Sequence, residues 1–258
     1  MKLFNFPQDS SSPRGVSGTA QNSPEAPNAN RPENYEISAP ACAQSADKSN
    51  KTLCEISALI FDIDNTLYTN AAYLEHQIEV QVQRFADMER ISFSQAEKRI
   101  ADARADFAAK HNGAKTSFAL IMKSFGYSTE ESIKWRSELI QPEKYLKKDA
   151  ELRIIMEKLA ARFKIISVTN NPVEIGWRNL KAIGIDDLFL DIVGLDTCHK
   201  SKPAPEPFLK AIEILGEPAE NCVSIGDRYD IDIATPLELG MHGVLVDGSK
   251  ELENLPFL

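Results

Sequence analysis

Two carboxylates one residue apart are the side chains of this sequence best suited to chemistry. Asp62 and Asp64 follow the apolar run from Ala58 to Phe61, and the hydroxyl of Thr66 comes shortly after them. A short apolar run that ends in polar residues is typical of a buried strand. Ligands of open α/β sheets bind just beyond the carboxyl ends of such strands. The pair therefore suits a nucleophile with a neighbouring general acid–base.

Further polar side chains follow apolar runs later in the sequence. In chain order they are Thr169 with Asn170, then Lys202 ahead of a proline, then Asp227 with Asp232. Taken singly, each has an ordinary interpretation as a solvated turn, a helix cap or a surface lysine. The carboxyl ends of parallel strands meet at one edge of a sheet, so we expect these residues to gather beside Asp62.

The hydrophobic pattern changes twice along the chain. Between Tyr68 and Ala161 it is helical, and its first helix has an apolar stripe with a spacing of three or four residues: Leu74, Ile78, Val82, Phe85 and Met88. Capping boxes at Ser92 and Ser128 start two further helices. From Phe163 onward strands and helices alternate, which predicts a parallel sheet covered on both faces.

These patterns predict an α/β fold with a Rossmann-like parallel sheet flanked by helices and an inserted all-helical cap domain. The catalytic core comprises residues 53–68 and 148–258, and the cap comprises residues 69–147. Residues 1–52 are mostly rich in Ser, Pro, Asn and Ala, with few large apolar side chains. Such a segment buries too little surface to offset its ordering entropy, so we expect a disordered tail.

The composition limits the classes of partner. The 258 residues are 43% hydrophobic and carry a formal charge of -9, which argues against a nucleic acid polymer or an anionic membrane as partner. No apolar stretch reaches the roughly 18 residues that span a bilayer. The four cysteines form no Cys-x-x-Cys pair, and a reduced, cytoplasmic location fits them best. The oligomeric state stays open.

In their order along the chain, the four polar sites resemble the motifs of the haloacid dehalogenase superfamily. Asp62, Asp64 and Thr66 match its Asp-x-Asp-x-Thr motif, and Thr169 matches its hydroxyl at a strand end. Lys202-Pro203 and the acidic loop from Gly226-Asp227 to Asp232 match the third and fourth motifs. The resemblance covers about residues 55–247, and the helical insert after the first motif resembles the superfamily's C1-type cap.

The resemblance also implies a role for each residue. Asp62 is expected to be the nucleophile and a ligand of a Mg²⁺ cofactor, together with Asp227 and the backbone carbonyl of Asp64. The side chain of Asp64 is expected to transfer protons. The substrate's phosphoryl group would be held by Thr169, Asn170 and Lys202, and the site would be supported from behind by Thr66 and Asp232.

The presence of Asp64 favours phosphoryl chemistry, because a leaving halide needs no proton. Asp62-Ile63-Asp64-Asn65-Thr66-Leu67-Tyr68 and Tyr145-Leu146-Lys147-Lys148-Asp149 resemble the pyrimidine 5'-nucleotidase branch. We therefore expect a Mg²⁺-dependent phosphomonoesterase that hydrolyses a small phosphorylated metabolite through an aspartyl-phosphate, with UMP and CMP as candidates. The alternatives are a phosphosugar phosphatase, a phosphomutase, and a catalytically weak binding protein that keeps the scaffold.

Overall fold

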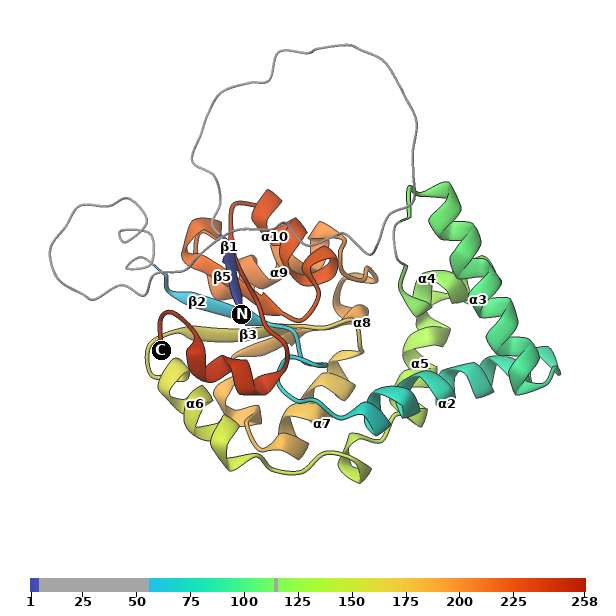
Figure 1. The fold of residues 1–258 in the computed structure, drawn as a ribbon, viewed down its shortest axis with the longest axis horizontal. Coiled ribbons are helices and arrows are strands. Elements are labelled where there is room, and N and C mark those ends of the chain that lie inside the picture. Colours follow the sequence, from blue (N-terminus) through green and yellow to red (C-terminus); the bar gives the residue numbers. More distant parts are fainter. Residues whose placement is uncertain (5–55, 114–115) are drawn as a thin grey trace, which may run out of the picture.

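One six-stranded sheet forms the centre of the protein. A computed structural model describes residues 1–4, 56–113 and 116–258. In these residues the strand order is β1-β6-β5-β2-β3-β4, and all neighbours except β1 and β6 run parallel (Figure 1). The strands are β1 (Lys2–Phe4), β2 (Ala58–Phe61), β3 (Lys164–Val168), β4 (Asp191–Val193), β5 (Cys222–Gly226) and β6 (His242–Leu245). The predicted α/β fold is confirmed.

Strand β2 is buried on both faces because its side chains alternate between two hydrophobic clusters. Leu59 and Phe61 pack in one cluster, whereas Ala58 and Ile60 pack in the other. Helices α6 (Ala150–Ala160) and α7 (Val173–Ile183) contribute side chains to the first cluster, and α9 (Pro205–Leu215) contributes to the second. The continuous apolar run is what a central parallel strand requires. It places Asp62 at the middle of the sheet's carboxyl edge.

Four helices lie between β2 and α6, to one side of the sheet (Figure 1). They are α2 (Ala71–Glu89), α3 (Phe93–Lys110), α4 (Phe118–Ser124) and α5 (Thr129–Leu139). These helices have a hydrophobic cluster of their own, which includes Phe85, Met122 and Trp135. At the base of the insert, Tyr73 and Ile140 pack instead with the sheet. The predicted helical insert is therefore present, and both predicted capping boxes form, at Ser92 and Ser128.

The shorter elements connect the main ones. The remaining helices are α8 (Leu195–Cys198) and α10 (Ala234–Glu238), with 3-10 turns at Pro142–Lys144, Asp186–Leu188, Ala219–Asn221 and Ser249–Asn254, and a π-helical turn at Tyr229–Ile233. Helix α7 starts without a cap from the asparagines that precede it. The side chain of Asp196 accepts a hydrogen bond from the Val173 amide instead, at 2.9 Å.

The predicted buried face of α2 is partly wrong. Ile78 and Met88 from the predicted apolar stripe are each 52% exposed. Tyr73, Gln77 and Gln81 are buried in their place. The helix is rotated so that the two glutamines meet polar groups of the core, and those hydrogen bonds offset the burial of their amides.

The predicted disordered tail is wrong for its first residues. Lys2–Phe4 form strand β1, which pairs antiparallel with β6, and the terminal amino group of Met1 lies 3.0 Å from Glu251. Without β1, β6 would be an edge strand with unpaired backbone groups. The N-terminal residues form hydrogen bonds with those groups. Residues 5–52 of the predicted tail lie outside the described residues.

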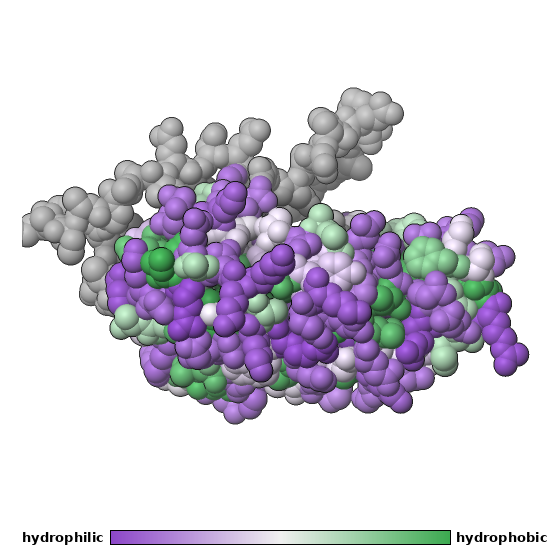
Figure 2. All heavy atoms as spheres, turned by 90° about the horizontal axis from the view of Figure 1, so that it is seen from below, coloured by the Kyte–Doolittle hydropathy of each residue, from purple (hydrophilic) through white to green (hydrophobic). Residues whose placement is uncertain are grey.

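One face of the molecule shows how polar and apolar side chains are distributed on it. The face seen from below in Figure 2 is mostly hydrophilic, with small separate hydrophobic areas. No helix in the described part of the chain is long and apolar enough to cross a membrane.

Candidate active site

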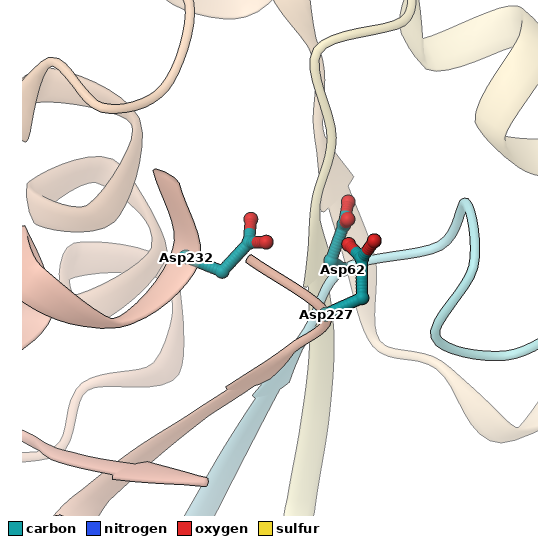
Figure 3. Close-up of side chains that lie close together, drawn as sticks. All are labelled: Asp62, Asp227 and Asp232. Carbon is teal, nitrogen blue, oxygen red and sulfur yellow. The ribbon is translucent and has the colours of Figure 1, made fainter. Parts of the chain in front are cut away.

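Three carboxylates from two distant parts of the sequence converge at the carboxyl edge of the sheet (Figure 3). Asp62 follows β2 and Asp227 follows β5, and these strands are paired neighbours. Asp232 lies on the π-helical turn Tyr229–Ile233 after β5. One oxygen from each of the three lies within 4.8 Å of the others. The expected gathering of acidic residues beside Asp62 is therefore present.

Lys202 joins two of these carboxylates. Its Nζ lies 2.8 Å from Oδ1 of Asp62 and 2.6 Å from Oδ1 of Asp232, and all three side chains are buried. Burial alone would lower the pKa of Lys202, but the charges of Asp232 and Asp62 outweigh it and raise that pKa. The lysine therefore stays a cation. Its attraction to the two carboxylates offsets the free-energy cost of removing its charge from water.

The loop after β3 holds Lys202 in place through its backbone. The side-chain oxygen of Asn170 accepts from the Lys202 amide at 2.7 Å, and its nitrogen donates to the Lys202 carbonyl at 3.2 Å. Thr169 is buried, and its hydroxyl oxygen accepts from the Asn171 amide at 3.2 Å. The geometry thus gives Asn170 a positioning contact with Lys202. The predicted contacts of Thr169 and Asn170 with substrate stay predictions.

Asp64 has an environment of its own. Its Oδ1 accepts from the Tyr68 hydroxyl and, at 2.8 Å, from Nε2 of Gln77, while its Oδ2 accepts from Nδ2 of Asn171 at 3.0 Å. Burial, followed by the charge of Asp62, raises the pKa of Asp64, although the hydrogen bonds from Tyr68 and Gln77 oppose that rise. A carboxyl group with a raised pKa is suited to donate and recover a proton.

Four polar residues near Asp64 were not predicted from the sequence. They are Gln77, Gln81, Arg136 and Asn171. A signal for the glutamines exists in the sequence. Tyr73, Gln77 and Gln81 recur every four residues, which places them on one helical face. If a buried helical face is allowed to contain amide side chains as well as apolar ones, this spacing identifies the buried side of α2.

The donor set at the sheet edge fits a divalent cation. Oδ2 of Asp62 and Oδ1 of Asp227 are buried and have no hydrogen-bond partner among the described residues. Both oxygens of Asp232 are already bonded, one to Lys202 and one to the Arg228 amide at 3.1 Å. Mg²⁺ prefers one or two carboxylates with waters and substrate oxygens. Asp62 and Asp227 suit that role, whereas Asp232 suits the support of Lys202.

Two further observations concern the predicted site residues. Burial, followed by the charges of Asp62 and Asp232, raises the pKa of Asp227 to about 7, so this carboxyl lacks a sufficient counter-charge. A cation between the carboxylates would supply it. Thr66 lies fully buried in the turn after Asp62, and its hydroxyl has no partner among the described residues.

The sheet, its helical insert and the acidic site at its carboxyl edge define an α/β protein with a Rossmann-like sheet and an inserted helical region. The sequence matches the family model described as haloacid dehalogenase-like hydrolase over residues 56–240, and the chain belongs to this family. The predicted superfamily is confirmed.

The relatives that the chain matches include proteins named as pyrophosphatases and proteins named as phosphatases. The chain is 38% identical over 96 residues to a phosphoglycolate phosphatase from Aquifex aeolicus, which is 37% of this chain and 45% of that protein. It is 24% identical over 203 residues to a glyceraldehyde 3-phosphate phosphatase from Methanopyrus kandleri, which is 76% of this chain and 85% of that protein. The chain spans about half the length of the first relatives that it matches, 52% and 45%.

A solved structure shares the fold. The HAD-hydrolase YfnB from Bacillus subtilis, bound to magnesium, superposes with a TM-score of 0.51 at 17% identity over 79% of this chain and 99% of that chain. The names of the two relatives refer to no nucleotidase, so the pyrimidine 5'-nucleotidase branch is not confirmed.

Gly226 tests how closely the acidic loop is packed. A Cβ added there would lie 2.3 Å from Cβ of Asp232, so Gly226→Ala must push Asp232 away from Lys202. We expect the free energy of unfolding to fall by roughly 1–3 kcal/mol, measured by urea denaturation. The matched control is Gly176→Ala, where a Cβ would lie no nearer than 3.0 Å to a side-chain methyl of Ile192. Equal losses for both variants would contradict the tight packing of Asp232.

Proposed function

We propose that the protein is a Mg²⁺-dependent phosphomonoesterase that hydrolyses a small phosphorylated metabolite through an aspartyl-phosphate on Asp62. The observation that carries the proposal is the asymmetry of the Asp62 carboxylate. Its Oδ1 is held by Lys202 at 2.8 Å, whereas its buried Oδ2 has no partner among the described residues. Lys202 orients Oδ1, which keeps a second lone pair that can serve the cation, and Oδ2 is available to attack phosphorus.

In the first step, Oδ2 of Asp62 forms a bond to phosphorus while the bond from phosphorus to the substrate oxygen breaks. Protonated Asp64 gives its proton to that leaving oxygen. In the second step, ionised Asp64 takes a proton from water, whose oxygen attacks the phosphorus. The bond between phosphorus and Asp62 then breaks, inorganic phosphate leaves, and Asp64 is protonated again for the next cycle.

Charge must be balanced throughout this reaction, because a carboxylate approaches an anionic phosphate. A Mg²⁺ ion, when bound, supplies positive charge that lowers this repulsion. We assign its ligands to Asp62, Asp227 and the backbone carbonyl of Asp64. Lys202 adds a fixed positive charge beside Asp62. Thr169 and Asn170, with Lys202, are the proposed contacts of the transferred phosphoryl group, and Thr66 and Asp232 support the site.

The proposed substrate is a small phosphorylated sugar or sugar acid. The names of the two relatives, which refer to phosphoglycolate and glyceraldehyde 3-phosphate, support this class. A pyrimidine nucleoside monophosphate remains the second candidate, on the resemblance of the Asp62–Tyr68 segment. We propose a cytoplasmic location, with no nucleic acid polymer or membrane as partner, and the free thiols of Cys198 and Cys222 suit a reducing compartment.

The nucleophile is tested with p-nitrophenyl phosphate. We expect the wild type to hydrolyse it with Mg²⁺ and to lose activity in EDTA. Asp62→Asn should lower kcat by about 10³-fold or more, because the amide cannot accept the phosphoryl group. The control is Asp230→Asn, an exposed acid of the same loop, which should retain its activity. A wild type that is inactive with every divalent metal would instead support a binding protein that keeps the scaffold.

The substrate class is tested with a panel of phosphate esters. We expect kcat/KM for phosphoglycolate or glyceraldehyde 3-phosphate to exceed that for UMP and CMP by about tenfold or more, since a pocket that fits one class discriminates by at least this factor. A preference for UMP and CMP would establish the nucleotidase alternative. Transfer of phosphate to a sugar without its release would establish the mutase alternative.

The raised pKa of Asp227 predicts how Mg²⁺ stabilisation depends on pH. The pKa is about 7 in the folded, metal-free protein and about 3.9 in an unfolded chain, so folding favours the protonated form. Metal-free stability therefore falls as pH rises from about 4 to about 7. Mg²⁺ needs the ionised form, so we expect 10 mM MgCl₂, a working concentration of about this order, to raise Tm more at pH 8 than at pH 5.5.

A matched variant isolates this effect. Asp227→Asn removes the ionisable group, so its metal-free Tm at pH 8 should exceed that of the wild type, and its response to Mg²⁺ should be small at both values of pH. An equal Mg²⁺ response of the wild type at both values would contradict the proposed role of Asp227 as a ligand.

A further inference from the structure

A buried arginine of the helical insert lies between the insert and the sheet. Arg136, on α5, is 6% exposed. Its Nε donates to Oε1 of Gln81 on α2 at 2.8 Å. Its Nη1 donates to the carbonyl of Asn170 and, at 3.4 Å, to Oδ1 of Asn171. These partners are neutral oxygens. Burying a guanidinium against neutral oxygens is an expensive way to join two parts of a protein, so a role beyond stability is called for.

The contacts of Arg136 continue along two branches to Asp64. On one branch, Gln81 donates to the backbone oxygen of Gln77, whose Nε2 donates to Oδ1 of Asp64 at 2.8 Å. On the other, Nδ2 of Asn171 donates to Oδ2 of Asp64 at 3.0 Å. The same nitrogen donates to Oε1 of Gln77 at 2.9 Å, which connects the two branches. Each oxygen of the Asp64 carboxylate therefore accepts a hydrogen bond from an amide of this network.

The chemistry of arginine decides which end of each amide faces Asp64. A guanidinium carries donors only, whereas a primary amide has a donor end and an acceptor end. Because Arg136 requires acceptors, Asn171 must present its oxygen to Arg136 and its nitrogen to Asp64. Gln81 must likewise present its oxygen to Arg136 and its nitrogen to the Gln77 backbone. Without Arg136, Asn171 can rotate by half a turn and present an acceptor where Asp64 needs a donor. Gln81 can likewise present an acceptor where the Gln77 carbonyl needs a donor.

We propose that Arg136 is a positioning residue for Asp64: it fixes the orientation of the surrounding amides and makes the geometry of the acid–base depend on how α2 and α5 sit on the sheet. The inference rests on the proposed function, because it concerns the proton transfers assigned to Asp64. It assigns no contact between Arg136 and the substrate.

The leaving group of the substrate tests this role. An alkoxide needs a proton from Asp64 as it leaves, whereas p-nitrophenolate leaves readily without one. The value of kcat/KM covers the steps up to formation of the phosphoenzyme, so it includes the acid step and excludes the later base step. In Arg136→Met we expect kcat/KM for the best alkyl phosphate of the panel to fall by about 100-fold, and that for p-nitrophenyl phosphate by less than about threefold.

Two variants give the matched comparison. Arg84→Met removes another arginine of the helical insert, one that pairs with Glu138 at 3.4 Å on the surface, and should change neither value. Arg136→Lys keeps the charge but replaces the planar fork with a single point donor, so we expect a partial loss with the alkyl substrate. An equal loss on both substrates in Arg136→Met would reduce Arg136 to a structural residue, and the absence of any loss would equally overturn the proposal.

Hydrogen exchange tests the same contacts without relying on activity. The amide of Leu195 donates to the Asn171 carbonyl at 2.9 Å, and the amide of Asn171 donates to the Thr169 hydroxyl. We expect both amides to exchange about tenfold faster in Arg136→Met and at the wild-type rate in Arg84→Met. Unchanged exchange overturns the proposal. If the wild type hydrolyses no ester, the proposed function fails while this measurement still reports on Arg136.

If Arg136→Met does not fold, Gln81→Met carries the same two tests. It removes the acceptor of the Arg136 Nε while leaving both arginine contacts with the β3–α7 loop. We expect the same selective loss on the alkyl phosphate, of about tenfold because one of the two branches to Asp64 remains. A loss shared equally by both substrates, or no loss, overturns the proposal here as well.

Discussion

The buried ion pairs of Lys202 are the interaction on which the site depends. Asp62, Asp227 and Asp232 lie close enough to repel one another, and water is largely excluded from Asp62 and Asp232. The ammonium balances part of this charge and fixes Oδ1 of Asp62. It does not balance all of it. Burial, followed by the charges of Asp62 and Asp232, raises the pKa of Asp227, and a divalent cation suits the remaining oxygens. The three carboxylates therefore lower the stability of the metal-free protein and make the site strongly negative.

The fold gives two neighbouring carboxylates different chemistry. Strand β2 ends at Phe61, so Asp62 still follows the direction of the sheet while Asp64 lies in the turn beyond it. Asp62 faces the ammonium of Lys202, and Asp64 faces a phenol and two amides. The ammonium of Lys202 orients one oxygen of Asp62, whereas burial raises the pKa of Asp64 and lets its carboxyl hold a proton. A spacing of one residue is enough because the backbone changes direction between them.

Strand ends were predictable from the sequence because they depend on local patterns. Ala58–Phe61 is bounded as the apolar run predicts, and parallel pairing then brings Asp62, Lys202 and Asp227 together. Gln77, Gln81 and Arg136 were not predictable in this way, since a helical pattern assigns polar residues to solvent. Their burial depends on partners supplied by the β3–α7 loop. Strand β1 was missed for a similar reason, because its partner β6 is near the other end of the chain.

The joint between the helical insert and the sheet is polar, and this has a consequence for motion. Most of the insert packs on its own hydrophobic cluster, while Tyr73 and Ile140 at its base pack in the cluster of the sheet. Near the site the two parts meet through hydrogen bonds such as those of Arg136, Gln77 and, at 3.0 Å, Ser117 with Ser201. The net free energy of such a hydrogen bond is small because water can replace it, so these contacts hold the insert less firmly than an apolar interface would. Hydrogen bonds are also directional. The amides of Gln77 and Asn171 therefore both point at Asp64 in a limited range of positions of the insert on the sheet.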